Sequence, residues 1–153
     1  MTGHLRLVRD LTSPIAVPAW PKGVTLVPFS ATLAPRVHDL MQCAYADGGG
    51  SVPPAFDAWW AATRHDTEFD AGLCIVAAKA EQPVGFALCW TSGFLKDLVV
   101  DPAWQGHGIG TALLRTALQA LKARGHREAA LKVHADNERA RRLYAANGFV
   151  DGS

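Results

Sequence analysis

The spacing of apolar positions changes near the middle of the chain, from a helical period to the period of β-strands. An early run, Val24–Phe29, predicts an edge strand or a strand end, because Pro28 cannot donate to a ladder. Two amphipathic stretches, about Pro35–Ala46 and Pro54–His65, predict helices that each begin with a proline in the first turn. Three further runs of β character are Leu73–Ala78, Val84–Thr91 and Phe94–Val100. The turn residues 81–83 predict a hairpin between the first two of these runs.

The last third of the chain returns to a helical period. Three elements are predicted there: a helix from Gly108 to Arg124, a strand over Ala129–His134 and a helix over Asn137–Ala146. A C-cap after the last helix should turn Phe149 back onto Leu143 or Tyr144. The order β-α-α-β-β-β-α-β-α predicts an α/β (α+β) fold, with a mixed sheet and helices on its faces.

The first 23 residues differ in composition from the rest. Prolines at 14, 18 and 21 forbid a helix and favour an extended chain. We therefore expect residues 1–23 to form a Pro-rich N-terminal arm packed on a single domain of residues 24–153. A chain of 153 residues buries enough surface to need no disulfide or metal to hold its core together.

Charge and cysteine content exclude several classes of function. Fifteen Lys and Arg against fourteen Asp and Glu give a net charge of +1, which argues against binding to nucleic acid or membrane through bulk charge. Cys43, Cys74 and Cys89 lack C-x-x-C spacing, which indicates buried thiols in a reducing compartment and no metal site. The N-terminus lacks a secretory signal, and the longest apolar run, Ala71–Ala78, is too short to span a membrane. We expect a cytoplasmic location.

The most informative stretch follows Val100, where glycines at 106, 108 and 110 open a helix. Glycines let a backbone approach a ligand closely, and the amides at a helix N-terminus favour a phosphate or pyrophosphate. A tight turn that only packs the helix on the strand is the structural alternative. No lysine follows, which excludes a P-loop. The spacing G-x-G-x-G also differs from the dinucleotide fingerprint, so dinucleotide binding is kept only as an alternative.

Two motifs in this half resemble those of the GNAT superfamily of acyl-CoA N-acyltransferases. The first is Gln105-x-x-Gly108-x-Gly110, preceded by Leu98-x-Val100-x-Pro102. The second is Asn137-x-x-Ala140-x-x-Leu143-Tyr144-x-x-x-Gly148-Phe149. The motifs occur in the family's order, and the resemblance covers about Val24–Phe149. It implies a GNAT-like, mostly antiparallel central sheet with helices on both faces, acetyl-CoA as cosubstrate and no metal.

The resemblance also assigns roles in binding acetyl-CoA. Backbone amides of the glycine loop would bind the pyrophosphate: Gln105, Gly106, His107, Gly108, Ile109, Gly110 and Thr111. The strand end formed by Leu98, Val99 and Val100 would diverge from its neighbour and pair with the pantetheine arm. An amide of Val99 or Val100 would polarise the thioester carbonyl. Asn137 would hydrogen-bond the pantetheine arm, and it also suits the N-cap of the last helix.

Two side chains are expected to act in catalysis. Tyr144 would protonate the leaving thiolate, with a place in the apolar core as its alternative. The strand Phe94–Val100 resembles the Leu-Glu-Asp-Leu strand of the diamine and thialysine acetyltransferase branch, but Lys96 stands where that branch has the Glu proposed as base. Asp97 is retained and is expected to hold or deprotonate the amine; the alternative is an ion pair with Lys96 or Arg115. His134 is a lesser candidate for the base.

Acceptor selection in such proteins comes from the helices after the first strand. This region offers acidic and aromatic side chains that either bind a cationic amine or pack in the core beside solvated acids: Asp57, Trp59, Trp60, His65, Asp66, Glu68 and Asp70. Family members continue through two more strands, so we expect a fold truncated at the C-terminus. Either the N-terminal arm or the partner subunit of a homodimer should then fill the place beside residues 129–134.

The function we expect is transfer of an acetyl group from acetyl-CoA to a primary amine of a small molecule or peptide. The amine should attack the thioester directly, in a ternary complex and without a covalent enzyme intermediate. The alternatives are a non-catalytic acyl-CoA-binding module and, third, a dinucleotide-binding protein.

Overall fold

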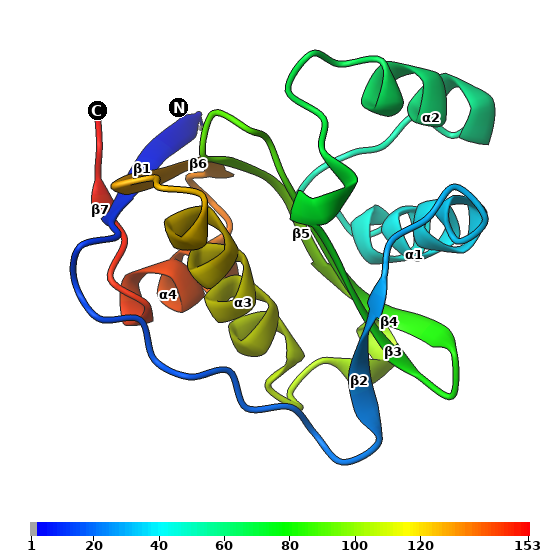
Figure 1. The fold of residues 1–153 in the computed structure, drawn as a ribbon, viewed down its shortest axis with the longest axis horizontal. Coiled ribbons are helices and arrows are strands. Elements are labelled where there is room, and N and C mark those ends of the chain that lie inside the picture. The colour runs from blue at the N-terminus through cyan, green and yellow to red at the C-terminus, as the bar shows by residue number, and fades with distance from the viewer. Residues whose placement is uncertain (1–2) are drawn as a thin grey trace.

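Within residues 3–153, which the computed structural model describes, the strands form one seven-stranded sheet (Figure 1). They are β1 (His4–Asp10), β2 (Val24–Pro28), β3 (Cys74–Lys79), β4 (Gln82–Cys89), β5 (Phe94–Val100), β6 (Glu128–His134) and β7 (Val150–Asp151). Their order across the sheet is β2-β3-β4-β5-β6-β1-β7, and every neighbouring pair is antiparallel except β5 and β6. The predicted mixed, mostly antiparallel sheet is confirmed.

Helices cover both faces of this sheet. They are α1 (Ala34–Tyr45), α2 (Phe56–Arg64), α3 (Ile109–Ala123) and α4 (Glu138–Ala146), with short 3₁₀ turns η1 (Ala71–Leu73) and η2 (Pro102–Trp104). α1 and α2 lie on one side of the sheet, and α3 and α4 lie on the other (Figure 1). Each side has its own apolar cluster. Val37 and Met41 of α1 pack with Phe86 on the first side, and Leu113 and Leu118 of α3 fill the second.

Gly85 brings α3 close to the sheet. A Cβ atom at this position of β4 would lie 2.7 Å from Cδ1 of Leu113 and 2.8 Å from Cγ2 of Ile109. No larger residue leaves room for the first turn of α3 at this distance. The glycine therefore fixes the N-terminus of α3 beside the end of β5, where the predicted ligand loop lies.

The hairpin between β3 and β4 turns earlier than the sequence predicts. Ala80 and Glu81 are the two turn residues, with φ of 49° and 68°, and β4 already begins at Gln82. Two successive residues with positive φ form the tight connection that matches the twist of antiparallel strands. Pro83, which the sequence analysis placed in the turn, lies in β4 opposite Ala78, next to a register shift.

The N-terminal segment contains a strand that the sequence analysis did not predict. β1 pairs with β6 along its whole length, from His4 opposite His134 to Asp10 opposite Glu128. The prolines begin only at position 14, so they do not disturb this strand. β7 pairs with the other edge of β1. The place beside β6 is therefore filled by the N-terminal segment, which was the first of the two expected occupants.

Candidate functional site

β5 and β6 separate soon after they begin. Their parallel pairing joins Phe94 to Ala130 and Leu95 to Leu131, and β6 then continues beside β1. The divergence leaves one edge of β5 open at Leu98–Val100. On the other edge the amide of Asp101 donates to the carbonyl of Val84 at 2.8 Å. Because successive N–H groups of a strand alternate in direction, the amide of Val99 faces β4, and those of Leu98 and Val100 face the open side.

A β-bulge lies in β5 at the start of this open edge. Asp97 is opposite Leu88, but Leu95 is opposite the very next residue, Cys89, so Lys96 is the extra residue. A bulge changes the direction of the side chains beside it. Here it leaves Lys96 exposed and turns Asp97 inward, where the whole residue is only 6% exposed.

The glycine loop presents unpaired amides at the N-terminus of α3. Gly106 and Gly108 have φ of 82° and 83°, and a Cβ atom at either would meet no heavy atom within 4 Å. In the part of the chain that the structure describes, the amides from Gly106 to Thr111 have no backbone acceptor. The amide of Gln105, which was expected to belong to this set, instead donates to the carbonyl of Pro102 at 3.4 Å. The first turn of α3 carries no acidic residue, whose negative charge would offset the positive potential at this end of the helix. This arrangement is suited to an anion such as a diphosphate.

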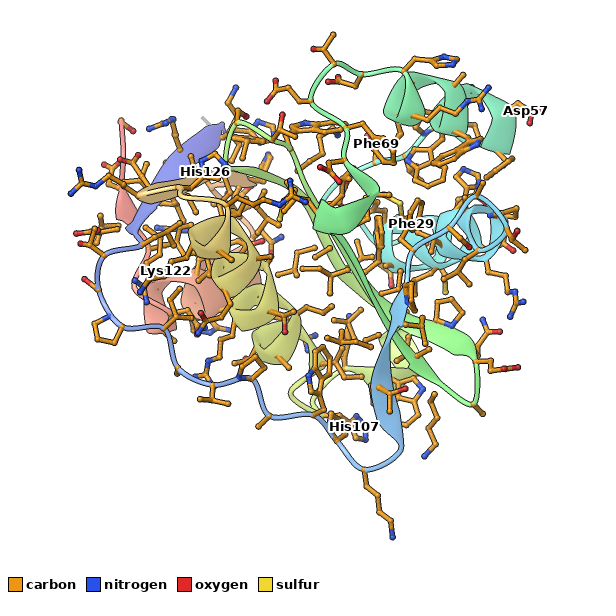
Figure 2. All side chains as sticks on the ribbon, in the orientation of Figure 1. Phe29, Asp57, Phe69, His107, Lys122 and His126 are labelled. Atoms are coloured by element: carbon orange, nitrogen blue, oxygen red, sulfur yellow. The ribbon has the colours of Figure 1, made fainter. Side chains whose placement is uncertain are left out.

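A groove of about 810 Å³ runs from this loop along the open edge of β5. It brings together the predicted cofactor-binding residues Leu98, Val99, Val100, Gln105, Gly106, Gly108, Ile109, Gly110, Thr111 and Asn137. The side chain of His107 lies outside the groove, on the loop before α3 (Figure 2). Its Nδ1 is 3.1 Å from the backbone carbonyl oxygens of Trp104 and Gln105.

Asn137 is the N-cap of α4 and lines the wall of the groove that is formed by this helix. Its Oδ1 accepts a hydrogen bond from the amide of Ala140 at 3.2 Å, so the predicted N-cap is confirmed. Its Nδ2 remains available, and a Cβ atom built on Gly49 would lie 3.3 Å from it. The loop after α1 and the N-terminus of α4 thus approach each other across the groove.

Tyr144 lies on the buried side of α4 and also lines the groove. Its ring is 5.6 Å from that of Phe149, whose amide donates to the Tyr144 carbonyl at 3.0 Å, so the predicted return of Phe149 is confirmed. Burial, together with the negative charge of Asp97, raises the pKa of Tyr144 to about 12. The phenol therefore stays protonated at neutral pH and can act as a donor.

Asp97 is paired with a residue that the sequence analysis missed. The hydroxyl of Tyr45 donates to Oδ1 of Asp97 at 2.7 Å. Lys96 Nζ is 4.0 Å from Oδ2, and Arg115 instead donates to Asn147. Burial raises the pKa of Asp97, although Lys96 and the hydrogen bond from Tyr45 act in the opposite direction. Tyr45 lines the groove and Asp97 does not. No motif marks Tyr45; its only sequence signal is its place beside the glycines at 48–50.

His134, the lesser candidate for the base, lies at the end of β6 and lines the groove. Its Nδ1 is 3.2 Å from the amide of Asp136, and its ring is 5.3 Å from that of His4. These contacts already account for the position of the ring.

Among the residues described, no three His, Cys, Asp or Glu side chains are grouped to hold a metal ion, and no helix has the length and hydropathy to cross a bilayer.

The residues expected to select the acceptor do not line the groove. Trp59 is buried and stacks on His38 with the ring centres 5.5 Å apart, and Trp60 packs against Phe29 and Phe69. Asp57 projects from the outer end of α2 (Figure 2). For Trp59 and Trp60 the structure supports the core alternative, which the sequence had left open. In place of these residues, the end of α1 and the loop after it line the groove: Ala44, Tyr45, Asp47, Gly48 and Gly49.

Comparison with known proteins agrees with this geometry. Residues 34–149 match the model of the Acetyltransferase (GNAT) family. The chain is 35% identical over 147 residues to a mycothiol acetyltransferase of Kineococcus radiotolerans, which covers 90% of this chain and 46% of the relative. It is 37% identical over 89 residues to an uncharacterised N-acetyltransferase of Methanocaldococcus jannaschii, covering 52% of this chain and 38% of that protein. The chain therefore spans less than half of these relatives.

Solved structures show the same fold. A GCN5-related N-acetyltransferase from Sphaerobacter thermophilus superimposes with a TM-score of 0.83 at 26% identity, over 97% of this chain and 48% of that one. The ribosomal-protein-S18-alanine N-acetyltransferase of Escherichia coli gives a TM-score of 0.61 at 20% identity, over 80% of this chain and 75% of that one. The family match and the shared fold lead to one conclusion: the chain belongs to the GNAT family of acetyltransferases.

Proposed function

We propose that this chain transfers an acetyl group from acetyl-CoA to a primary amine by direct attack in a ternary complex. The observation that carries the proposal is the continuity of the groove. It leads from the free amides at the N-terminus of α3, along the open edge of β5, to Tyr144 and Tyr45. An extended ligand with a diphosphate at one end and amide groups along its length fits this series of donors and acceptors.

Acetyl-CoA would bind through the backbone more than through side chains. The amides from Gly106 to Thr111 bind the pyrophosphate. The open edge of β5 at Leu98 and Val100 pairs with the pantetheine amides, and Asn137 Nδ2 binds the arm from the opposite wall. Of the two amides expected to polarise the thioester, that of Val100 faces the open side. It would stabilise the negative charge that develops on the carbonyl oxygen.

The amine must be neutral to attack, since an ammonium ion has no lone pair. In the proposed step its nitrogen bonds to the thioester carbon and the carbon–sulfur bond breaks. The amine proton passes to Asp97, whose burial makes its carboxylate a stronger base than an exposed one. The leaving sulfur receives a proton from the phenol of Tyr144, and solvent then reprotonates the phenolate. Because its raised pKa makes Tyr144 a weak acid, the phenol first hydrogen-bonds to the sulfur and transfers its proton only as the carbon–sulfur bond breaks.

The named relatives support acetyl transfer and differ in acceptor, so we propose the class of acceptor only: a primary amine of a small molecule or peptide. Cys43 is exposed, contrary to the expectation of three buried thiols, whereas the buried free thiols of Cys74 and Cys89 support the expectation of a reducing, cytoplasmic location.

Calorimetry with acetyl-CoA and a coenzyme A release assay test this proposal. The assay uses 1,4-diaminobutane, glucosamine, alanine amide and a peptide with N-terminal alanine. We expect micromolar binding and release of coenzyme A with at least one amine. Binding without release from any amine would favour the non-catalytic module, and NADH binding in place of acetyl-CoA binding would favour the dinucleotide alternative.

A further inference from the structure

We propose that Tyr45 is a catalytic residue of this acetyl transfer, which contacts the acceptor amine and relays its proton to Asp97. The inference rests on the proposed function and adds to it the route of the proton. It is carried by the position of Tyr45, which lines the groove and whose hydroxyl donates to a buried carboxylate.

The first step is access. Asp97 is 6% exposed and does not line the groove, whereas Tyr45 does. The hydroxyl of Tyr45 donates its single proton to Asp97 Oδ1 at 2.7 Å. A phenolic oxygen that donates in one direction keeps its lone pairs for a donor in another. An amine that enters the groove therefore meets the oxygen of Tyr45 before it can reach Asp97.

The second step is the fixed position of the ring. Tyr45 is the last residue of α1, and the chain folds back over it through residues 47–50. A Cβ atom on Gly50 would lie 2.6 Å from Cε1 and 2.9 Å from Cζ of Tyr45. Only glycine allows the loop to pack on the ring at this distance. The packing and the hydrogen bond to Asp97 hold the hydroxyl from two sides.

The third step is the charge around the pair. The groups that act on Asp97 are Lys96 on its own strand and Tyr45 on α1, and its charge in turn acts on Tyr144 of α4 and Cys74 of β3. Burial and the neighbouring carboxylate raise the pKa of Tyr45, so a phenolate is strongly disfavoured. The two protons must therefore move together. As the nitrogen attacks, its proton passes to Tyr45 Oη and the phenolic proton passes to Asp97 Oδ1, which leaves the phenol neutral.

Tyr45→Phe and Asp97→Asn test the relay, with Cys43→Ala on the exposed side of α1 as the control. Each variant is assayed with the four amines named above, and its acetyl-CoA affinity and Tm are measured. We expect Tyr45→Phe to lower kcat/KM about 10²-fold with unchanged coenzyme affinity. Asp97→Asn should lower kcat/KM by a similar factor, and the double variant should lower it no further than either single variant. Cys43→Ala should leave kcat/KM unchanged. Gly50→Ala displaces the ring, so its kcat/KM should lie between those of Tyr45→Phe and the wild type.

The pH profile separates a relay from simple packing. Tyr45→Phe removes the hydrogen bond that lowers the pKa of Asp97, so the acidic limb of kcat/KM should move to higher pH, while the titration of the free amine is the same for all variants. A Tyr45→Phe variant with wild-type kcat/KM, or with an unmoved acidic limb, would overturn the relay and leave the proposed function standing. If the wild type binds acetyl-CoA and acetylates none of the four amines, the proposed function fails and the relay fails with it.

Discussion

Arg139 and Gln105 join the two walls of the groove. The guanidinium of Arg139, in the first turn of α4, donates to Oε1 of Gln105 at 2.6 Å, and both residues line the groove. Gln105 stands directly before the glycines of the loop, so this bond ties the loop to the helix that also carries Asn137 and Tyr144. It adds a positive charge near the free amides, where a diphosphate is expected.

Arg139→Ala should therefore weaken acetyl-CoA binding about fivefold, the equivalent of about 1 kcal/mol for a lost hydrogen bond. Arg142→Ala is the matched control, since Arg142 lies on the same helix, faces solvent and pairs only loosely with Glu138 at 3.9 Å. Calorimetry measures both variants. Equal affinities for Arg139→Ala and Arg142→Ala would show that the tie does not contribute to binding.

Gly108→Val should abolish measurable binding of acetyl-CoA. Valine at a φ of 83° costs at least about 1–2 kcal/mol, and the strain would fall on a loop that lines the groove and carries the free amides. Gly125→Val introduces the same residue at a φ of 89°, but after the end of α3 and outside the groove. The Tm of both variants should fall to a similar extent, and only Gly108→Val should lose acetyl-CoA binding. Retained binding in Gly108→Val would place the diphosphate elsewhere.

Tyr144→Phe should reduce kcat about 10²-fold while acetyl-CoA affinity and Tm stay close to those of the wild type, because the ring keeps its packing against Phe149. The pKa of Tyr144 is raised to about 12, so the phenol remains protonated up to that pH and should add no basic limb to the wild-type profile below about pH 11. Turnover by Tyr144→Phe at the wild-type rate would remove Tyr144 from the mechanism.

Asp97→Asn should raise stability at neutral pH. The folded-state pKa of Asp97 lies above its ordinary value because of burial, so the folded state binds a proton more tightly than the unfolded state does. The carboxyl therefore destabilises the fold increasingly as the pH rises from its unfolded pKa of about 3.9 through the raised folded value. We expect a higher Tm for Asp97→Asn at pH 7 and convergence with the wild type below about pH 4. A lower Tm for the variant at pH 7 would contradict the sign of this shift.

Asp47→Asn should raise the KM for a cationic amine about threefold to tenfold, since Asp47 is an acidic residue that lines the groove two positions after Tyr45, with which we propose that the acceptor makes contact. Asp57→Asn removes the same charge from the outer end of α2 and should leave the KM unchanged (Figure 2). Salt should diminish the difference between the two variants. Equal KM values would assign acceptor binding to another part of the surface.

The elements whose pattern is local could be predicted from the sequence. The bounds of β5 agree with the predicted strand, and the glycines at 106 and 108 do open α3. β4 began two residues before the predicted start, because left-handed turn conformations at Ala80 and Glu81 leave no sequence signal when neither residue is glycine or asparagine. β1 was missed because its partners in β6 lie 118 to 130 residues away.

The parts of the site that depend on distant contacts could not be predicted. Tyr45 reaches Asp97 across 52 positions of sequence, and only the packing of α1 on the sheet brings them together. The acidic and aromatic residues around Trp59 looked chemically suited to an amine. Trp59 and Trp60 instead pack in the core, because α2 turns its apolar face to α1 and away from the groove. The acids beyond α2 make local contacts, such as the ion pair of Asp70 with Arg124.

The central place of β1 has a consequence for the order of folding. β1 pairs with β6 and β7, whose residues lie 118 or more positions later in the sequence. Contacts between residues so far apart form slowly, so this half of the sheet should close after the consecutive strands β3, β4 and β5 have paired.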